Sequence, residues 1–258
     1  MSFNFNEFLS FANLLADLAS KTSMQYFRKK IDIENKDDES PVTIADKETE
    51  KVIRDKIRNT YTNHGILGEE YENENLNSEF IWVIDPIDGT RSYIAGHKDF
   101  GNLIALLHNN KPIIGIINCP AHNERWIGVK NNKTTCNGKE VSTSGINDIK
   151  NAYLFTSGVY FYEPIFRKGF ESIKQKTKYF RLGGDCYMYG MLSSGLIDIV
   201  IEDTLKAHDY MALINVVEGA GGKITDKYGK PIDLQSDGSL VATSSNILHD
   251  EIIKIINN

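Results

Sequence analysis

Apolar residues recur at helical spacing near the start of the chain and gather into short β-branched runs further on. Residues 5 to 30 predict an amphipathic helix that ends in the basic run Arg28-Lys29-Lys30. Residues 31 to 40 are polar and predict a solvated loop, and Lys47 to Arg58 predict a second amphipathic helix. The stripe of the first helix consists of Phe8, Phe11, Leu14, Leu15, Leu18 and Ala19, and that of the second of Val52, Ile53 and Ile57.

The next part of the chain predicts strands joined by tight turns. Asn109-Asn110 and Asn137-Gly138 are turn signals between apolar runs and indicate an antiparallel meander. Pro86 has no N–H for a sheet ladder, so the strand that begins at Trp82 is expected to end there. The expected strands are 65–67, 82–84, 100–107, 112–118 and 125–129.

Strands and helices alternate after residue 150, which is typical of an α/β unit. The change predicts an α+β half over residues 1–147 and an α/β half over residues 148–258. The expected strands there are 152–157, 178–182, 196–201, 223–225 and 240–243, and the expected helices are 164–176, 183–194, 207–219 and 249–256.

Composition limits the function classes. Of 258 residues, 41% are hydrophobic and 25% charged, as in a globular protein, and the net charge of −6 leaves no basic footprint for nucleic acid. No apolar run reaches membrane-spanning length, and the start lacks signal-peptide features. Three unevenly spaced cysteines predict free thiols in a reducing compartment, so we expect a cytoplasmic protein.

Two aspartates stand at the end of the strand that begins at Trp82. Asp85 and Asp88 are three residues apart, and like charges this close raise each other's pKa unless a cation joins them. A hard divalent cation suits such oxygen ligands. The alternative is an ordinary solvated turn, because Asp-Pro and Asp-Gly are common turn pairs. For Thr90, the alternative to a role in such a site is to cap the helix that follows.

The segment Asp85-Pro86-Ile87-Asp88-Gly89-Thr90 resembles the signature of the inositol monophosphatase family of magnesium-dependent, lithium-sensitive phosphatases. The longer run IDPIDGTRSYIAGHKDFGNLIAL, residues 84–106, looks most like the histidinol-phosphatase branch. The resemblance implies a layered α/β/α/β/α sugar-phosphatase fold, a homodimer and a small phosphate monoester as substrate.

The resemblance also implies a metal site. It makes Glu69, Asp85, Asp88 and Asp209 ligands, with the Ile87 carbonyl as a backbone ligand. Two or three Mg²⁺ ions are implied, with Mn²⁺ as an alternative and inhibition by Li⁺ expected. His208 precedes Asp209, but a lone histidine more often packs or lies at the surface, as we expect for all six histidines.

Three residues have implied roles around the attacking water. Asp46 ends the run Pro41-Val42-Thr43-Ile44-Ala45-Asp46, which resembles a second family motif, and pairs with the hydroxyl of Thr90. Glu69, from Gly68-Glu69-Glu70, orients that water with them. The backbone amides of Gly89 and Thr90 are expected to hold phosphate. The alternative role of Asp46 is to cap the helix that follows. The roles of Lys36 and Glu70 stay open.

Substrate choice is expected to rest on Asp185 and Glu202. Their carboxylates would suit an alcohol that carries an ammonium and an imidazole, as L-histidinol does. Gly184 and Arg91 belong to the same substrate-binding segments, and a helix cap is the alternative role of Asp185. The leading hypothesis is hydrolysis of L-histidinol phosphate in histidine biosynthesis. Its alternatives are an inositol-1-phosphate or broad sugar monophosphatase and, from another class, a non-catalytic relative.

Overall fold

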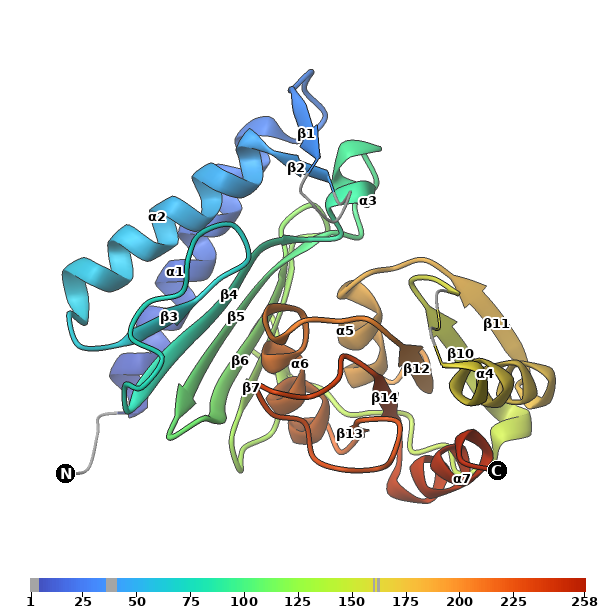
Figure 1. Ribbon diagram of the computed structural model, residues 1–258. Helices are drawn as coiled ribbons and strands as arrows, with labels where there is room; N and C mark the ends of the chain where they lie inside the picture. Colours follow the sequence, from blue (N-terminus) through green and yellow to red (C-terminus); the bar gives the residue numbers. More distant parts are fainter. Residues whose placement is uncertain (1–4, 36–40, 160, 162) are drawn as a thin grey trace.

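The computed structural model describes residues 5–35, 41–159, 161 and 163–258, so the open question of Lys36 lies outside the described residues. Two large sheets, one two-stranded sheet and seven α-helices form the described part (Figure 1). None of these helices is long and apolar enough to cross a membrane. The helices are α1 (Phe5–Tyr26), α2 (Ile44–Thr60), α3 (Thr90–Ile94), α4 (Pro164–Lys176), α5 (Tyr187–Ser193), α6 (Ala207–Gly219) and α7 (Asn246–Ile256).

The first large sheet has seven strands in the order β3-β4-β5-β6-β7-β8-β9. β3 pairs parallel with β4, and every later pair is antiparallel, which confirms the predicted meander. Helices α1 and α2 cover one face, where Leu15 and Ile53 pack with Trp82 and Ile104. The strands are β3 (Gly65–Leu67), β4 (Phe80–Asp88), β5 (Gly101–His108), β6 (Lys111–Cys119), β7 (Glu124–Val129), β8 (Thr135–Cys136) and β9 (Lys139–Glu140).

The second large sheet has five strands in the order β11-β10-β12-β14-β13. Helices α4 and α7 cover its outer face through a cluster that includes Phe170, Ile199 and Ile252. Helices α5 and α6 lie between the two sheets, so the layers run α/β/α/β/α, as predicted (Figure 1). The strands are β10 (Tyr153–Thr156), β11 (Tyr179–Leu182), β12 (Ile199–Glu202), β13 (Lys223–Thr225) and β14 (Leu240–Thr243).

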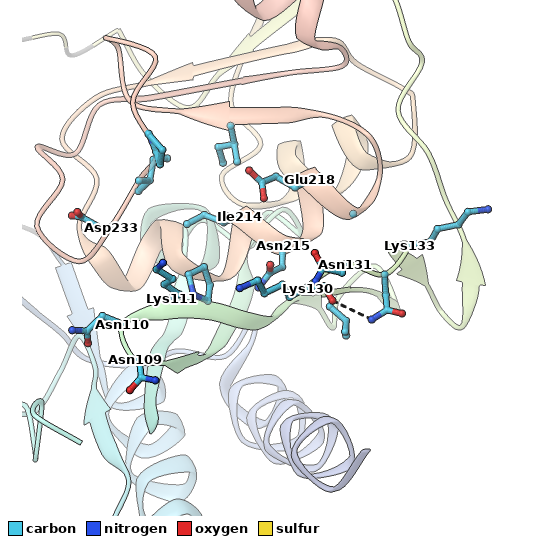
Figure 2. Close-up of a pocket in the computed structure, with 17 residues that line it drawn as sticks. Asn109, Asn110, Lys111, Lys130, Asn131, Lys133, Ile214, Asn215, Glu218 and Asp233 are labelled. Atoms are coloured by element: carbon cyan, nitrogen blue, oxygen red, sulfur yellow. Dashed lines mark hydrogen bonds between the residues drawn. The ribbon is translucent and has the colours of Figure 1, made fainter. Parts of the chain in front are cut away.

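Helix α6 ties the C-terminal part of the chain to the first sheet. It packs on β6 and β7 at glycines: a Cβ on Gly115 would lie 2.0 Å from the carbonyl oxygen of Ala212. A Cβ on Gly128 would lie 2.2 Å from the backbone carbon of Asn215. At the end of α6, a Cβ on Gly219 would lie 2.8 Å from the carbonyl oxygen of Asn132 in the β7–β8 connection; Figure 2 labels the nearby α6 residues Asn215 and Glu218. The division at residue 147 stays a prediction.

Several element boundaries differ from the sequence prediction. Helix α1 ends at Tyr26, before the basic run, and Arg28 adopts a left-handed φ of 58°. Its guanidinium donates to the carbonyl of Gly96 instead of completing a helix end. The predicted loop contains strand β1 (Ile33–Asn35), which pairs with β2 (Pro41–Thr43).

The prediction that a strand ends at Pro86 was wrong. β4 continues to Asp88, which pairs with Gly101 after a register shift, so Pro86 lies in a bulge. A bulge tolerates a residue without an N–H because the ladder is already interrupted there. The Pro86 carbonyl accepts a hydrogen bond of 2.6 Å from the buried Asn102 side chain, which fixes the bulge.

Candidate active site

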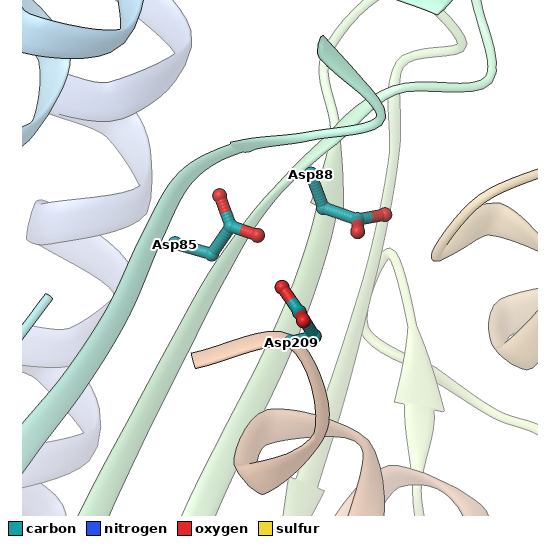
Figure 3. Close-up of side chains that lie close together, drawn as sticks. All are labelled: Asp85, Asp88 and Asp209. Carbon is teal, nitrogen blue, oxygen red and sulfur yellow. The ribbon is translucent and has the colours of Figure 1, made fainter. Parts of the chain in front are cut away.

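The bulge in β4 brings three carboxylates together. Asp85 and Asp88 lie on either side of it, and Asp209 projects toward them from the first turn of α6 (Figure 3). One oxygen from each of the three lies within 4.8 Å of the others. Glu69 lies in the loop that follows β3 and is not one of these three; after burial, which is the larger cause, its charge also raises the pKa of Asp85, Asp46 and Asp209.

The electrostatics of this cluster favour a cation. Burial, together with repulsion from neighbouring carboxylates, raises the pKa of Asp85 and Asp88 well above the ordinary value, and burial raises that of Asp209. Within the described residues, no Lys or Arg forms an ion pair with Asp85 or Asp88. Convergent oxygen ligands, buried at Asp85 and partly buried at Asp88 and Asp209, with no Lys or Arg paired to Asp85 or Asp88, fit a divalent metal such as Mg²⁺ or Mn²⁺.

Thr90 and Asp46 are hydrogen-bonded to each other. The Thr90 hydroxyl lies 3.3 Å from Asp46 Oδ1 and 3.2 Å from the Ile87 carbonyl oxygen. The other carboxylate oxygen of Asp46 accepts from the Thr43 N–H and hydroxyl, at 2.9 and 2.6 Å. Asp46 is therefore at the third helical position (N3) of a capping box, and Thr43 rather than Asp46 is the cap of α2.

Thr90 does not cap α3 either. Gly89 is the cap residue, without a side-chain hydrogen bond, and its φ of 81° is one that glycine adopts readily. Thr90 begins the helix, which leaves its hydroxyl for Asp46 and Ile87.

Sequence reasoning missed the residue that holds the Glu69 loop. The buried carboxylate of Glu50 accepts from the backbone N–H groups of Glu69, Glu70 and Tyr71, at 3.0, 2.7 and 3.3 Å. Arg54 pairs with it at 2.7 Å. The i,i+4 spacing of an acid and a base next to Ile53 and Ile57 was an available signal, but such pairs usually lie on a solvated face.

Asp185 lies beside the turn that carries Asp88. A Cβ on Gly89 would lie 2.7 Å from Asp185 Cγ, so only glycine fits there without a shift. Asp185 accepts from the Ser92 hydroxyl at 2.5 Å. The cap residue of α5 is Cys186, with no side-chain hydrogen bond, so the helix-cap alternative for Asp185 does not hold. The Cys186 N–H instead donates to Asp88 Oδ2 at 2.6 Å.

Glu202 ends β12 and is buried in a polar network. It accepts from the Tyr189 hydroxyl at 2.6 Å and from the Ser157 hydroxyl. Burial raises the pKa of Glu202 to about 7. A cavity of about 40 Å³, room for a water or two, lies among these groups. Its carboxylate lining consists of Asp88, Asp185, Glu202 and Asp209.

The remaining predicted residues are more peripheral. Arg91 is exposed on α3, and Gly184 has a φ of 125° with Met188 against it. His208 is mostly buried, with Nε2 3.5 Å from Asp209 Oδ1. The cluster of potential ligands found among the described residues includes no histidine. Glu70 contributes its backbone N–H to the Glu50 network.

Comparisons with known proteins identify the family of this chain. A model of the inositol monophosphatase family matches residues 4–258. A protein of Arabidopsis thaliana, "Bifunctional phosphatase IMPL2, chloroplastic", is 42% identical over 94% of this chain and 71% of its own length. The histidinol-phosphatase of Chlorobaculum parvum is 31% identical over 97% of this chain and 96% of its own.

A solved structure extends the similarity to the whole fold. The inositol monophosphatase from Zymomonas mobilis superposes with a TM-score of 0.90 at 36% identity, covering 100% of both chains. The chain belongs to the inositol monophosphatase family.

Proposed function

We propose that this phosphoric monoester hydrolase is magnesium-dependent and converts L-histidinol phosphate and water to L-histidinol and phosphate. The observation that carries the substrate assignment is the position of Asp185, a carboxylate beside Gly89 and in the same cavity wall as Asp88 and Asp209. If metal neutralises the Asp88 and Asp209 side of the site, Asp185 is left to face the alcohol. An ammonium or imidazolium group is the natural partner of such a carboxylate.

The proposed chemistry uses residues that are already in contact. A divalent cation held by Glu69, Asp85, Asp88 and Asp209 would offset the charge of the phosphate and make water more acidic. The Thr90 hydroxyl donates to Asp46, so its lone pairs can accept a hydrogen from a water aimed at phosphorus. Burial raises the pKa of Asp46, which suits a group that receives a proton. Water then replaces the alcohol directly, without a covalent phosphoenzyme.

The two carboxylates proposed to bind the substrate differ in how many hydrogen bonds they already accept from the protein. Glu202 already accepts from Tyr189 and Ser157, whereas the described partner of Asp185 is Ser92. We therefore assign the direct contact with the cationic alcohol to Asp185, and the support of that wall to Glu202.

An inositol-1-phosphate or broad sugar monophosphatase is the second candidate. It is favoured by the similarity to the Zymomonas mobilis inositol monophosphatase. This reading uses the same metal and water groups and differs only in what Asp185 contacts.

Phosphate release from histidinol phosphate, inositol 1-phosphate and a hexose phosphate, with Mg²⁺ present, tests the substrate. We expect the highest kcat/KM for histidinol phosphate. Asp185→Asn should lower it about ten- to a hundredfold, because a charge-assisted contact contributes roughly 1.5–3 kcal/mol. Inositol 1-phosphate, which has no cation, should be nearly unaffected.

Asp250→Asn, at an exposed position on α7, is the matched control and should change neither substrate. Equal losses for both substrates in Asp185→Asn would assign Asp185 a structural role. If inositol 1-phosphate is the better substrate of the unmutated enzyme, the histidinol assignment fails and the phosphatase assignment stands. The implied homodimer stays a prediction, for which light scattering is the measurement.

A further inference from the structure

A second, larger pocket lies at the other end of the first sheet. It has a volume of about 800 Å³, is open to solvent on one side, and is lined by α6, the β5–β6 turn, the connection from β7 to β8 and residues 231–233 (Figure 2). This volume is within the range of small-molecule sites, roughly 300–1,000 Å³.

The pocket is separate from the carboxylate site. Asp88 pairs with Gly101 at the first residue of β5, whereas Lys111, which lines the pocket, pairs with His108 at the last. Those two ends of β5 are about 24 Å apart. The residues that line the pocket include none of the predicted site residues.

An unpartnered amide lies in the wall. Asn215 is only 5% exposed, and within the described chain its Nδ2 has no hydrogen-bond partner. Figure 2 shows its side chain below α6, between the helix and the strands that close the pocket. A buried donor without an acceptor destabilises the protein, because it has lost its hydrogen bond to water and gained none in return. A bound molecule with an acceptor atom would remove that penalty.

The rest of the lining divides into apolar walls and a basic mouth. Pro112, Ile214, Ile224 and Ile232 supply apolar surface. Lys111 and Lys130 are exposed at the rim, and neither forms an ion pair in the part of the chain that the structure describes.

The other charged groups of the lining offset this basic rim only in part. Lys133 is engaged by Glu140 at 2.9 Å. Two acids, Glu218 and Asp233, also line the pocket, but Asp233 Oδ1 accepts from the Gln235 N–H. With Lys133 paired to Glu140, and with the charge of Lys223 acting on Glu218, Lys111 and Lys130 are left against Asp233.

We propose that this pocket is an accessory binding site for an organic anion with a flat, apolar body, of the heteroaromatic carboxylate or phosphate class. The apolar walls would cover the ring, the Asn215 amide would donate to an acceptor on it, and Lys111 and Lys130 would attract the anionic group. The site is independent of the proposed phosphatase substrate, because it shares no residue with the carboxylate cluster.

Calorimetric titration with indole-3-acetate tests the site on the intact protein, with neutral indole-3-acetamide as the matched ligand. We expect indole-3-acetate to bind with a millimolar or lower Kd, at least several-fold more tightly than the amide, and more weakly as salt is added. It should leave the KM for the phosphate substrate unchanged, since the two sites are separate. Its methylene-linked carboxylate serves as the anion, and its ring as the apolar body.

Variants locate the binding. Asn215→Asp replaces the donor by a negative charge of the same size and should weaken indole-3-acetate at least about tenfold. The pair Lys111→Gln and Lys130→Gln, combined in one protein, should weaken it about five- to tenfold. Lys139→Gln, an exposed lysine of β9 outside the pocket, should have no effect.

Unchanged Tm values show that the variants fold, and the lysine variant covers the case in which Asn215→Asp does not. The proposal is overturned if indole-3-acetate fails to bind at about 10 mM. Equal affinity for the acid and the amide, or full affinity in both pocket variants, also overturns it. So does competition with the phosphate substrate, which would place the probe in the carboxylate site.

Discussion

Substituting Glu50 by glutamine should show how much a buried carboxylate contributes to placing Glu69. Glu50 Oε2 accepts from the backbone N–H groups of Glu69 and Glu70, at 3.0 and 2.7 Å. Oε1 accepts from Arg54 at 2.7 Å and from the Tyr71 N–H at 3.3 Å. Glutamine has nearly the same shape but only one acceptor oxygen, so one side of this arrangement must face an NH₂ group.

The magnitude follows from which contacts are lost. Hydrogen bonds to a charged group contribute about 1.5–3 kcal/mol each, and removing one partner of a buried ion pair costs about 3–5 kcal/mol. Arg54 retains Glu74 at 2.7 Å, which offsets part of that loss. We therefore expect Glu50→Gln to lower the free energy of unfolding by about 3 kcal/mol. For a chain of this size that corresponds to a Tm lower by about 6–12 °C.

Thermal unfolding and a Mg²⁺ titration of activity measure the two consequences. Because the backbone of Glu69 is no longer fixed, half-maximal activity should need more Mg²⁺ in Glu50→Gln. Glu48→Gln, an exposed neighbour on α2, is the matched control and should stay within about 0.5 kcal/mol of the unmutated protein. If Glu50→Gln unfolds and titrates like the control, Glu50 does not position the loop.

Three further predictions concern the site and the core. Asp88→Asn should abolish most phosphatase activity measured with Mg²⁺. In chelator at pH 8 the same variant should have a higher Tm, because it removes a negative charge that burial and Asp185 disfavour. A lower Tm in chelator would contradict this repulsion. Thr90→Ala should lower kcat on the order of 10²-fold with little change in KM, while Thr90→Ser retains most activity; a loss confined to KM would make Thr90 a phosphate anchor. Burial lowers the pKa of His249 from 6.5 to about 4. The neutral imidazole therefore stabilises the fold above pH 6.5 by up to about 3 kcal/mol, and this contribution is lost as the pH falls toward 4. Denaturant titrations of His249→Gln should show a flatter stability profile over that range, and an unchanged slope would refute the assignment.

Local patterns in the sequence determined most of the elements. Helices α4 and α6 occupy the predicted ranges 164–176 and 207–219, and Asn137-Gly138 joins two strands as expected. Periodicity and turn chemistry act over a few residues, so they can be read without knowing what the element packs against. The Asp85–Thr90 motif likewise pointed to the family, and the family to the layered fold.

Contacts between distant segments were decided only by the tertiary structure. A proline rule that holds for a regular strand failed at Pro86, because Asn102 and the pairing of Asp88 with Gly101 stabilise a bulge there. Nothing within α2 alone tells that Glu50 and Arg54 face a loop rather than water.

The roles of Asp185 and Glu202 on the substrate side of the site were likewise decided by contacts between distant segments. As isolated residues, Asp185 is a plausible cap and Glu202 a plausible ligand for a cation. The fold sets Asp185 against Gly89 and gives Glu202 the hydroxyls of Tyr189 and Ser157. The sequence by itself fixes which groups can ionise and donate, but burial and partners set their pKa and their availability, and both depend on segments far apart in the chain.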